Sequence, residues 1–262
     1  MTDQRSEPAT QPLSLAGRTV LVTGGNGGIG LGIASACAHA GADIVIWGRD
    51  PAKNQRAVAA VEELGRSAAA MICDVSDQSQ VRDAFSASVA IAGRVDSVFA
   101  NAGINGTPAP FLELEYEEWQ RILRTNLDGT FHTFQEAARH MVQRGGGSLV
   151  GVSSIAALHG GASIEAYGAA KTAVLGLVRA LAVGLGRHRV RVNALVPGWT
   201  ITDMSRAVHS AERFREAVTA RTPVRRWAGV SEMGSAAVFL ADPTSTFHTG
   251  DTVVVDGGYT IG

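Results

Sequence analysis

A tyrosine and a lysine four positions apart are the residues whose spacing most directly suggests chemistry in this chain. Tyr167 and Lys171 lie in a stretch of small residues with a helical composition. Positions i and i+4 share one face of a helix, so the ammonium group can lie beside the phenol. A phenol has an unperturbed pKa of about 10, and a neighbouring cation stabilises its ionised form and lowers that pKa. We predict that Tyr167 transfers a proton.

A serine hydroxyl supplies the second group that such a proton transfer needs. Ser154 lies thirteen positions before Tyr167 and directly after an apolar run. Its hydroxyl can bind a substrate oxygen and stabilise the negative charge that develops there. Ser153 is the competing candidate for this role.

A glycine-rich stretch, 23–30, links the apolar run 19–23 to a segment of helical length. Glycines let backbone N–H groups approach a pyrophosphate, and a helix N-terminus supplies partial positive charge for the same anion. The alternative is a turn that binds nothing. The spacing is not that of nucleoside triphosphatases. The predicted contacts are Thr23, Gly24, Asn26, Gly28, Ile29 and Gly30.

The residues after the second apolar run, 44–47, indicate which dinucleotide binds. NAD enzymes place an acidic residue here for the ribose 2′-hydroxyl, whereas an arginine accommodates the 2′-phosphate of NADP. Gly48 stands at this position and Arg49 follows it, so the sequence favours NADP(H) and leaves NAD(H) as the alternative. Asp50, which precedes Pro51, is more simply a helix N-cap than a ribose ligand.

The loop sequence TGGNGGIG resembles the TGxxxGxG motif of the short-chain dehydrogenase/reductase family, in its compact single-domain branch. That branch includes 3-oxoacyl-acyl-carrier-protein reductases and gluconate 5-dehydrogenases. Further motifs follow in the family's order, and the resemblance runs from about residue 15 to residue 258. It implies that Ser154 rather than Ser153 is catalytic. It also implies that Asn126 completes a tetrad with Tyr167 and Lys171, although Asn126 could instead bond its own helix backbone.

The resemblance also implies the remaining cofactor contacts. An Asp-Val pair contacts the adenine in this family, and Asp74 and Val75 match it. The alternative role for Asp74 is a helix cap. Residues 101–103 resemble the NNAG motif, with Ala100 in place of the first asparagine. Residues after a Pro-Gly pair surround the nicotinamide, and Tyr167 and Lys171 adjoin its ribose. The implied contacts are Asp74, Val75, Asn101, Ala102, Gly103, Tyr167, Lys171, Pro197, Gly198, Thr200 and Thr202.

Alternating strand-like and helical segments must position these residues. The apolar runs are continuous, which is typical of strands buried on both faces of a parallel sheet. We expect strands at 19–23, 44–47, 69–73, 97–100, 149–153, 190–196 and 252–255, and helices that include 28–40, 52–64, 79–92 and 166–185.

This alternation predicts an α/β class, a single-domain Rossmann fold with a doubly wound parallel sheet of about seven strands flanked by helices. The first strand should lie near the sheet centre. We assign 1–12 to a flexible tail and 13–262 to the domain, with a substrate lid at about 199–223.

Composition excludes several classes of function. The chain is 45% hydrophobic with a net charge of −1, so it can form a large core and has no overall field that would recruit nucleic acid or anionic lipid. No apolar run approaches membrane-spanning length. The two cysteines do not form a CxxC pair, so we predict no metal site and a cytoplasmic protein with reduced thiols. The resemblance implies a homotetramer.

These features together predict an NAD(P)-dependent oxidoreductase. It would move a hydride between the cofactor and a small-molecule carbonyl or secondary alcohol, such as a 3-oxoacyl compound or another ketone. The alternative is a non-catalytic dinucleotide-binding redox sensor on the same fold.

Overall fold

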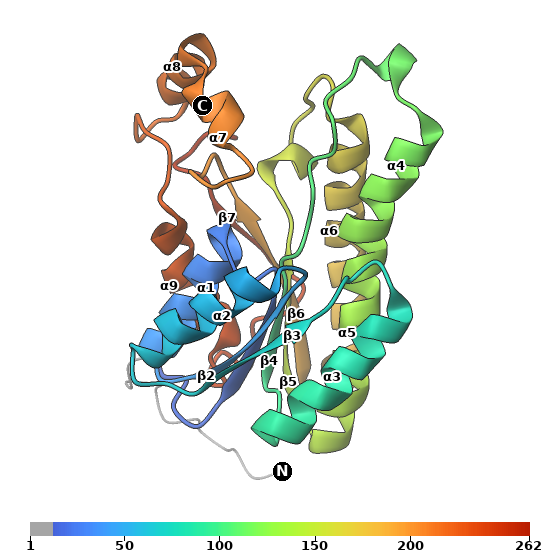
Figure 1. Ribbon diagram of the computed structural model, residues 1–262, viewed down its shortest axis with the longest axis vertical. Helices are drawn as coiled ribbons and strands as arrows, with labels where there is room; N and C mark the ends of the chain where they lie inside the picture. The colour runs from blue at the N-terminus through green and yellow to red at the C-terminus, as the bar shows by residue number, and fades with distance from the viewer. Residues whose placement is uncertain (1–12) are drawn as a thin grey trace, which may run out of the picture.

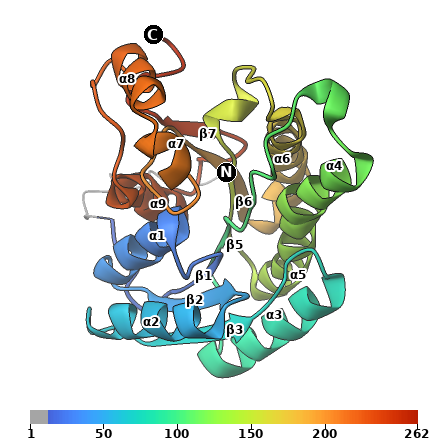
Figure 2. The ribbon, with the colours of Figure 1, turned by 45° about the horizontal axis from the view of Figure 1, so that its top comes forward.

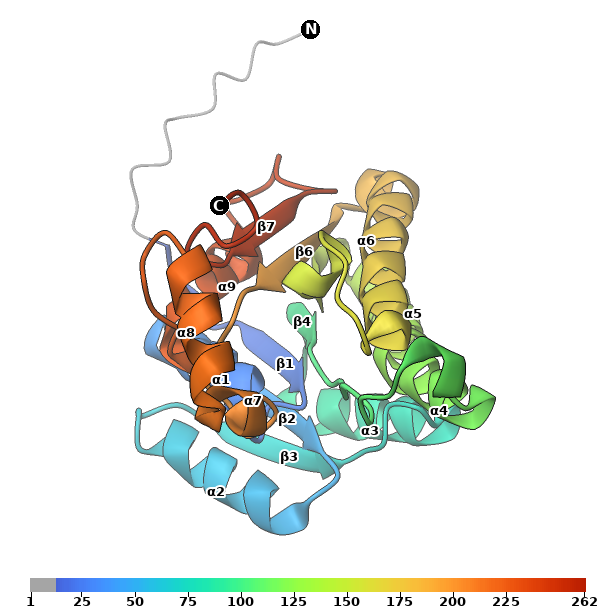
Figure 3. The ribbon, with the colours of Figure 1, turned by 90° about the horizontal axis from the view of Figure 1, so that it is seen from above.

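A computed structural model describes residues 13–262, and the predicted tail 1–12 lies outside the described residues. Seven parallel strands form one sheet in the order β3-β2-β1-β4-β5-β6-β7. Figure 3 looks onto the ends of these strands. The strands are β1 (Thr19–Thr23), β2 (Asp43–Gly48), β3 (Ala68–Ile72), β4 (Ser97–Ala100), β5 (Gly147–Val152), β6 (Val190–Pro197) and β7 (Thr252–Val255).

The strands follow the predicted apolar runs, and β1 lies near the sheet centre as expected. β1, β4 and β6 are buried along their whole length, because helices cover both faces of the interior strands. β3 and β7 differ, with partly exposed residues throughout. They are the two edge strands, so each has only one neighbouring strand to cover it.

Helices form a layer on each face of the sheet (Figures 1 and 2). α1 (Gly28–His39), α2 (Pro51–Glu62) and α9 (Gly234–Ala241) pack on one face through Ile33, Val61 and Leu240. The second layer packs on the other face through Phe85, Phe134 and Val178. Its helices are α3 (Gln78–Ala92), α5 (Gly129–Arg144) and α6 (Glu165–Leu185).

Shorter elements extend beyond these layers at the ends of the strands. α7 (Arg206–Ser210) and α8 (Glu212–Arg221) lie beyond the carboxyl ends, where Figure 1 shows them above the sheet. α4 (Tyr116–Leu123) continues into α5 through the π turn η2 (Arg124–Asp128). The 3-10 turns are η1 (Phe111–Glu113), η3 (Ile155–Ala157), η4 (Gly186–His188) and η5 (Val230–Met233).

The expectation that no apolar segment approaches membrane-spanning length is wrong. The helical segment Glu165–His188 has 24 residues and a mean hydropathy of 1.5, which suffice by length and composition alone. α6, which forms most of it, packs against β6 and buries Ala170, Val174 and Val178. A helix that is apolar because it covers a sheet meets the same criteria as a membrane span.

Candidate active site

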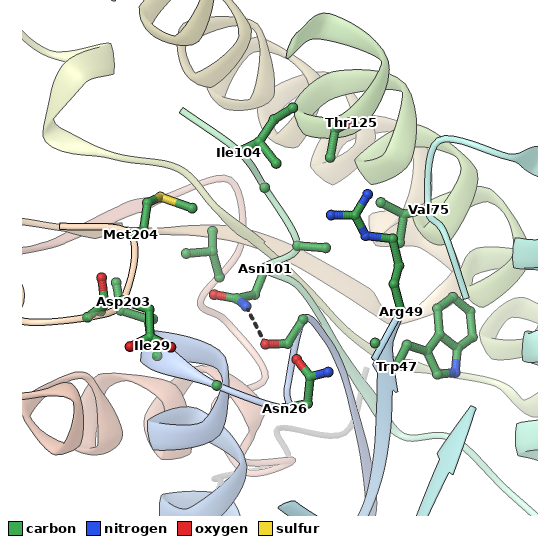
Figure 4. A pocket seen from close by; sticks show the side chains of 18 of the residues that line it. Asn26, Ile29, Trp47, Arg49, Val75, Asn101, Ile104, Thr125, Asp203 and Met204 are labelled. Atoms are coloured by element: carbon green, nitrogen blue, oxygen red, sulfur yellow. Dashed lines mark hydrogen bonds between the residues drawn. The ribbon is translucent and has the colours of Figure 1, made fainter. Parts of the chain in front are cut away.

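A groove of about 350 Å³ lies at the carboxyl ends of the strands. Its lining comes from the segments after β1, β2, β3, β4 and β6, from the end of β5 and from α6 (Figure 4). In a doubly wound sheet this edge, where the strand order reverses, is where ligands bind. The predicted phosphate loop, adenosine contacts and catalytic pair therefore meet in one place.

The phosphate loop presents an open helix N-terminus to this groove. Helices α2 and α3 are capped by Asp50 and Asp77, but α1 has no side-chain cap and no acidic residue in its first turn. Its free N–H groups and partial positive charge suit an anion. Gly24 and Gly28 have φ values of 62° and 52°, which glycine adopts without strain.

Gly30 allows the start of α1 to pack tightly against the loop. A Cβ at Gly30 would lie 2.2 Å from the carbonyl oxygen of Gly24, so no larger residue fits unless the loop moves. The pyrophosphate of a dinucleotide therefore has both the close approach and the dipole that it needs, and the residues present fit this group.

Thr23 does not line the groove, and its side chain instead connects the phosphate loop to the segment after β4. Its Oγ1 accepts hydrogen bonds from the backbone N–H groups of Asn101 and Ala102, both at 3.0 Å. Asn101 Nδ2 donates to the carbonyl oxygens of Thr23 and Gly24, at 2.9 and 3.3 Å. These bonds join the ends of β1 and β4 at the centre of the groove, and Figure 4 shows Asn101 at this position.

The part of the groove lined by Gly48, Arg49, Lys53 and Asp74 is called the adenosine end, because the predicted adenosine contacts lie there. No acidic side chain fits at Gly48. A Cβ there would lie 2.1 Å from Asn26 Nδ2 and 2.4 Å from Asn54 Oδ1. Both amides are held in place, because Asn26 donates to Asn54 at 2.7 Å and Asn54 Nδ2 donates to the Gly48 carbonyl at 2.9 Å. The place of a ribose-binding carboxylate is filled by these two amides.

The acidic residues near this end are already engaged. Asp50 accepts a hydrogen bond from the Lys53 backbone N–H at 3.0 Å, which confirms it as the N-cap of α2. Asp74 accepts from the N–H and hydroxyl of Ser76 at 3.0 and 2.7 Å. Asp77 is the N-cap of α3, so the helix-cap alternative for Asp74 is wrong.

Lys53 is a cation in the groove that the sequence analysis missed. It lines the groove together with Arg49, which lies four residues earlier and precedes the N-cap of α2, and its Nζ lies 3.6 Å from an Asp203 carboxylate oxygen. Arg49 in turn lies 3.5 Å from Asp74. These ion pairs are exposed and therefore weak, so a more highly charged anion can displace them. In the sequence, the position of Lys53 only four residues after Arg49 could have indicated a second cation for the same phosphate.

Tyr167 and Lys171 line the groove together with Ser153, and Ser154 adjoins Tyr167 without lining the groove itself. Lys171 Nζ lies 5.7 Å from the centre of the Tyr167 ring and donates to the Val152 carbonyl at 2.9 Å. Burial raises the pKa of Tyr167, and a hydrogen bond with Ser154 opposes this rise. Burial also lowers the pKa of Lys171 to about 8. The pKa of Tyr167 is thus raised rather than lowered as expected, because desolvation outweighs the hydrogen bond with Ser154.

The two candidate serines have separate surroundings. Ser153 is buried, and its hydroxyl donates to the carbonyl oxygen of Lys171 at 2.8 Å. The Ser154 hydroxyl instead faces Tyr167 and accepts from the Ala156 N–H at 3.1 Å. Ser153 therefore anchors the α6 backbone, whereas Ser154 adjoins the phenol.

Asn126 lies in the π turn η2 and is fully buried. Its Nδ2 donates to the carbonyl oxygens of Ile104 and Ile122, both at 2.9 Å, and its Oδ1 accepts from the Ile104 N–H at 3.2 Å. A Cβ at Gly103 would lie 2.5 Å from Asn126 Oδ1 and 3.4 Å from Lys171 Nζ. Asn126 thus bonds the backbone and also lies on the same side of Gly103 as the lysine.

The remaining predicted contacts divide into two groups. Asn26, Gly28, Ile29, Val75, Ala102, Gly103 and Thr202 line the groove. Among the described residues, Pro197, Gly198 and Thr200 are not part of this lining. The Thr200 hydroxyl donates to the Gly198 carbonyl at 3.0 Å. Contact of these three residues with the nicotinamide stays a prediction. Residues 13–262 contain no group of three metal-binding side chains.

Comparisons with known proteins agree with this geometry. The family described as Enoyl-(Acyl carrier protein) reductase matches residues 24–260. Gluconate 5-dehydrogenase of Gluconobacter oxydans (strain 621H) is 37% identical over 248 residues, which cover 95% of this chain and 96% of the relative. The 3-oxoacyl-(acyl-carrier-protein) reductase of Chlamydia pneumoniae is 32% identical over 248 residues, covering 95% and 99%.

A solved structure has the same fold over nearly the whole chain. The gluconate 5-dehydrogenase of Burkholderia cenocepacia J2315, in complex with NADP and tartrate, superimposes with a TM-score of 0.91 at 36% identity. The match covers 95% of this chain and 98% of that one. The chain belongs to the short-chain dehydrogenase/reductase family of NAD(P)-dependent oxidoreductases, as its phosphate loop and its tyrosine–lysine pair predicted.

Proposed function

We propose that this protein reversibly interconverts a secondary alcohol and a ketone with Asn126, Ser154, Tyr167 and Lys171 as its catalytic set. The convergence of the Ser154 hydroxyl, the Tyr167 phenol and the Lys171 ammonium beside the phosphate-loop groove carries this proposal. A nicotinamide cofactor, when bound, supplies or accepts the hydride. The protein supplies the proton and holds the reacting oxygen.

Each residue of the set has a distinct role. The Ser154 and Tyr167 hydroxyls hold the substrate oxygen, and Tyr167 donates its proton in the direction of reduction. The raised pKa of Tyr167 keeps the phenol protonated at neutral pH, as a donor must be. Lys171 is largely protonated at pH 7, since its pKa is about 8, and Asn126 supports the resupply of protons at its side.

NADP(H) is the cofactor that the adenosine end fits best. The guanidinium of Arg49 and the ammonium of Lys53 can pair with a 2′-phosphate. Gly48 cannot be replaced by a ribose-binding acid while Asn26 and Asn54 fill the space beside it. The proposed contacts elsewhere are the phosphate loop, Asp74 and Val75 at the adenine and Thr202 near the nicotinamide.

Binding of 2′,5′-ADP and 5′-AMP tests this cofactor preference without turnover. We expect titration calorimetry to show tighter binding of 2′,5′-ADP to the wild type. Arg49→Gln and Lys53→Gln should each weaken it roughly tenfold, since a charge-assisted bond contributes about 1.5–3 kcal/mol. Arg56→Gln is the matched control, because Arg56 is an exposed cation of α2 outside the groove lining. Tighter binding of 5′-AMP would reverse the assignment.

Tyr167→Phe separates catalysis from binding. We expect this variant to bind NADPH with unchanged affinity and to lose NADPH oxidation with any ketone that the wild type reduces. Undiminished turnover would refute the role of Tyr167. The redox-sensor alternative has no support among the named relatives, which are dehydrogenases and reductases.

The substrate is proposed to be a polyhydroxy acid or its keto form. Several relatives act on such compounds by name, including 2-dehydro-3-deoxy-D-gluconate 5-dehydrogenase of Bacillus subtilis and 5-keto-D-gluconate 5-reductase of Escherichia coli. Screening NADP and NAD with aldonates, keto-aldonates and acyl thioesters tests this class. Activity confined to 3-oxoacyl thioesters would favour the other relatives' reaction.

The domain and lid assignments also enter this proposal. Residues 13–262 are proposed to act as one domain, with 199–223 as the segment that covers the substrate. Met204 and Asp203 line the groove from this segment, and α8 rests on Trp199 through Phe214 at a ring separation of 5.2 Å. Protection of this segment from protease by cofactor and substrate tests its closure.

We further propose a cytoplasmic homotetramer. An apolar groove of about 460 Å³ between α5 and α6 has Phe131 at 43% exposure, and Ala138, Val142, Leu181 and Leu185 line it further. Exposed apolar surface of this kind suits contact with a second copy. Light scattering should give a tetramer for the wild type and a smaller species for Phe131→Asp. Cell fractionation tests the compartment.

A further inference from the structure

A second cavity, of about 400 Å³, opens at the edge of the sheet opposite the cofactor groove. Its lining includes residues that precede β1, β4, β5, β6 and β7 or lie in their first positions. Because parallel strands all begin at this edge, segments far apart in the sequence meet here. The cavity shares no lining residue with the cofactor groove.

Positive charge dominates this cavity. Its charged lining residues are Arg18, Arg94, Asp96, Arg144, Arg189 and Arg191. Asp96 is shared, since its carboxylate accepts from Arg94 Nε at 2.7 Å and from Arg18 Nη1 at 3.4 Å. Within the described residues, Arg144 and Arg189 form no ion pair. The lining therefore has a surplus of cations that one carboxylate does not neutralise.

Arg191 is the buried member of this set, with only 7% of the residue exposed. Its Nη2 donates to the carbonyl oxygens of Leu240 and Asp242, at 2.9 and 3.0 Å. Its Nη1 is buried and has no hydrogen-bond partner among residues 13–262. The Asp242 carboxylate behind it is engaged by the N–H groups of Ser14 and Thr244 at 2.8 and 2.7 Å. An unpartnered buried donor is costly, so an acceptor from a ligand is favourable here.

We propose that this cavity binds a small anion that carries phosphate or carboxylate groups, through Arg144, Arg189 and Arg191. A guanidinium presents a planar fork that matches both groups. The volume lies within the range of about 300–1,000 Å³ that small-molecule sites occupy. Such a ligand joins the end of α5 to the start of β6, and it stabilises the folded chain in proportion to its occupancy.

Titration calorimetry with inorganic pyrophosphate and with citrate tests the site. The ionic strength is held at about 0.15 M, where long-range attraction is screened. NADP⁺ is present in excess, so that the phosphate loop does not contribute. We expect one saturable site in the wild type and roughly tenfold weaker binding in Arg144→Gln/Arg189→Gln. Arg82→Gln/Arg213→Gln, two exposed arginines outside the cavity, should bind as the wild type does.

The outcomes distinguish the ligand classes. Binding of pyrophosphate alone indicates a phosphate ester, binding of citrate alone indicates a polycarboxylate, and binding of both supports a general polyanion site. Unchanged NADP⁺ affinity verifies that the double variant is folded. Absence of saturable binding for both probes, or equal affinity in the double variant and the wild type, overturns the proposal.

Discussion

The Lys171 ammonium group is held in a buried position, with 4% of the residue exposed, and donates to the Val152 carbonyl at 2.9 Å. Burial lowers its pKa from 10.5 to about 8. At about 1.4 kcal/mol per pKa unit, this change corresponds to about 3 kcal/mol of instability at pH 7. Lys171→Met removes that cost and loses one hydrogen bond of about 1 kcal/mol. We expect the variant to be more stable by about 2 kcal/mol and inactive.

The pH dependence has a definite sign. Because the folded-state pKa lies below the unfolded one, the unfolded chain binds more protons between pH 8 and pH 10.5. The unfolding free energy of the wild type therefore rises with pH through this window. By about pH 9.5 the wild type should gain roughly 2 kcal/mol. The stability advantage of Lys171→Met should therefore disappear there.

Urea denaturation without cofactor, followed by tryptophan fluorescence at pH 7 and about pH 9.5, measures both effects. Lys53 is the other lysine of the sequence and is exposed, so Lys53→Met is the matched control. Its stability should stay within about 0.5 kcal/mol of the wild type at both pH values. A Lys171→Met variant that is less stable at pH 7, or whose advantage is independent of pH, would refute the reasoning.

Three further predictions concern the two serines, the phosphate loop and the two cysteines. Ser154→Ala should lower kcat by about 10²–10³-fold, as loss of an oxyanion donor does, and steady-state kinetics measure this. Ser153→Ala should chiefly lower the free energy of unfolding, by about 1 kcal/mol, which urea denaturation measures. Gly30→Ala should weaken NADP binding at least about tenfold, because its Cβ would lie 2.2 Å from the Gly24 carbonyl oxygen; calorimetry measures this, and unchanged affinity would contradict it. Burial raises the pKa of Cys37 and Cys73 to about 12, so both should resist iodoacetamide at pH 8 in the native state; rapid labelling seen by mass spectrometry would contradict their burial.

The sequence was sufficient to predict the sheet and the proximity of Tyr167 and Lys171. Continuous apolar runs identify strands because a parallel sheet is covered on both faces, and β1, β4 and β7 have the predicted bounds. Tyr167 and Lys171 were predictable from helical spacing, since their relation is local. Asp50 was predictable as a cap for the same reason.

Side-chain directions across the sheet were not predictable in this way. Thr23 lies in the phosphate-loop motif, yet its hydroxyl bonds the backbone after β4, and that contact depends on which strands are neighbours. Lys53 meets Asp203 only because α2 and the segment after β6 converge on one groove. The sign of the Tyr167 pKa change depends on burial, which spacing alone does not reveal.

The π turn η2 constrains how this protein can evolve. A π turn holds one more residue than an α-helical turn, so a single-residue deletion at 124–128 would rotate all of α5 relative to α4. From this turn, the Asn126 side-chain amide also donates to the carbonyl of Ile122 in the last turn of α4. A substitution that changes the chemistry at Asn126 therefore also removes a support of the helix. A residue that replaces Asn126 must therefore both support the site and replace the hydrogen bonds to the Ile104 and Ile122 backbone.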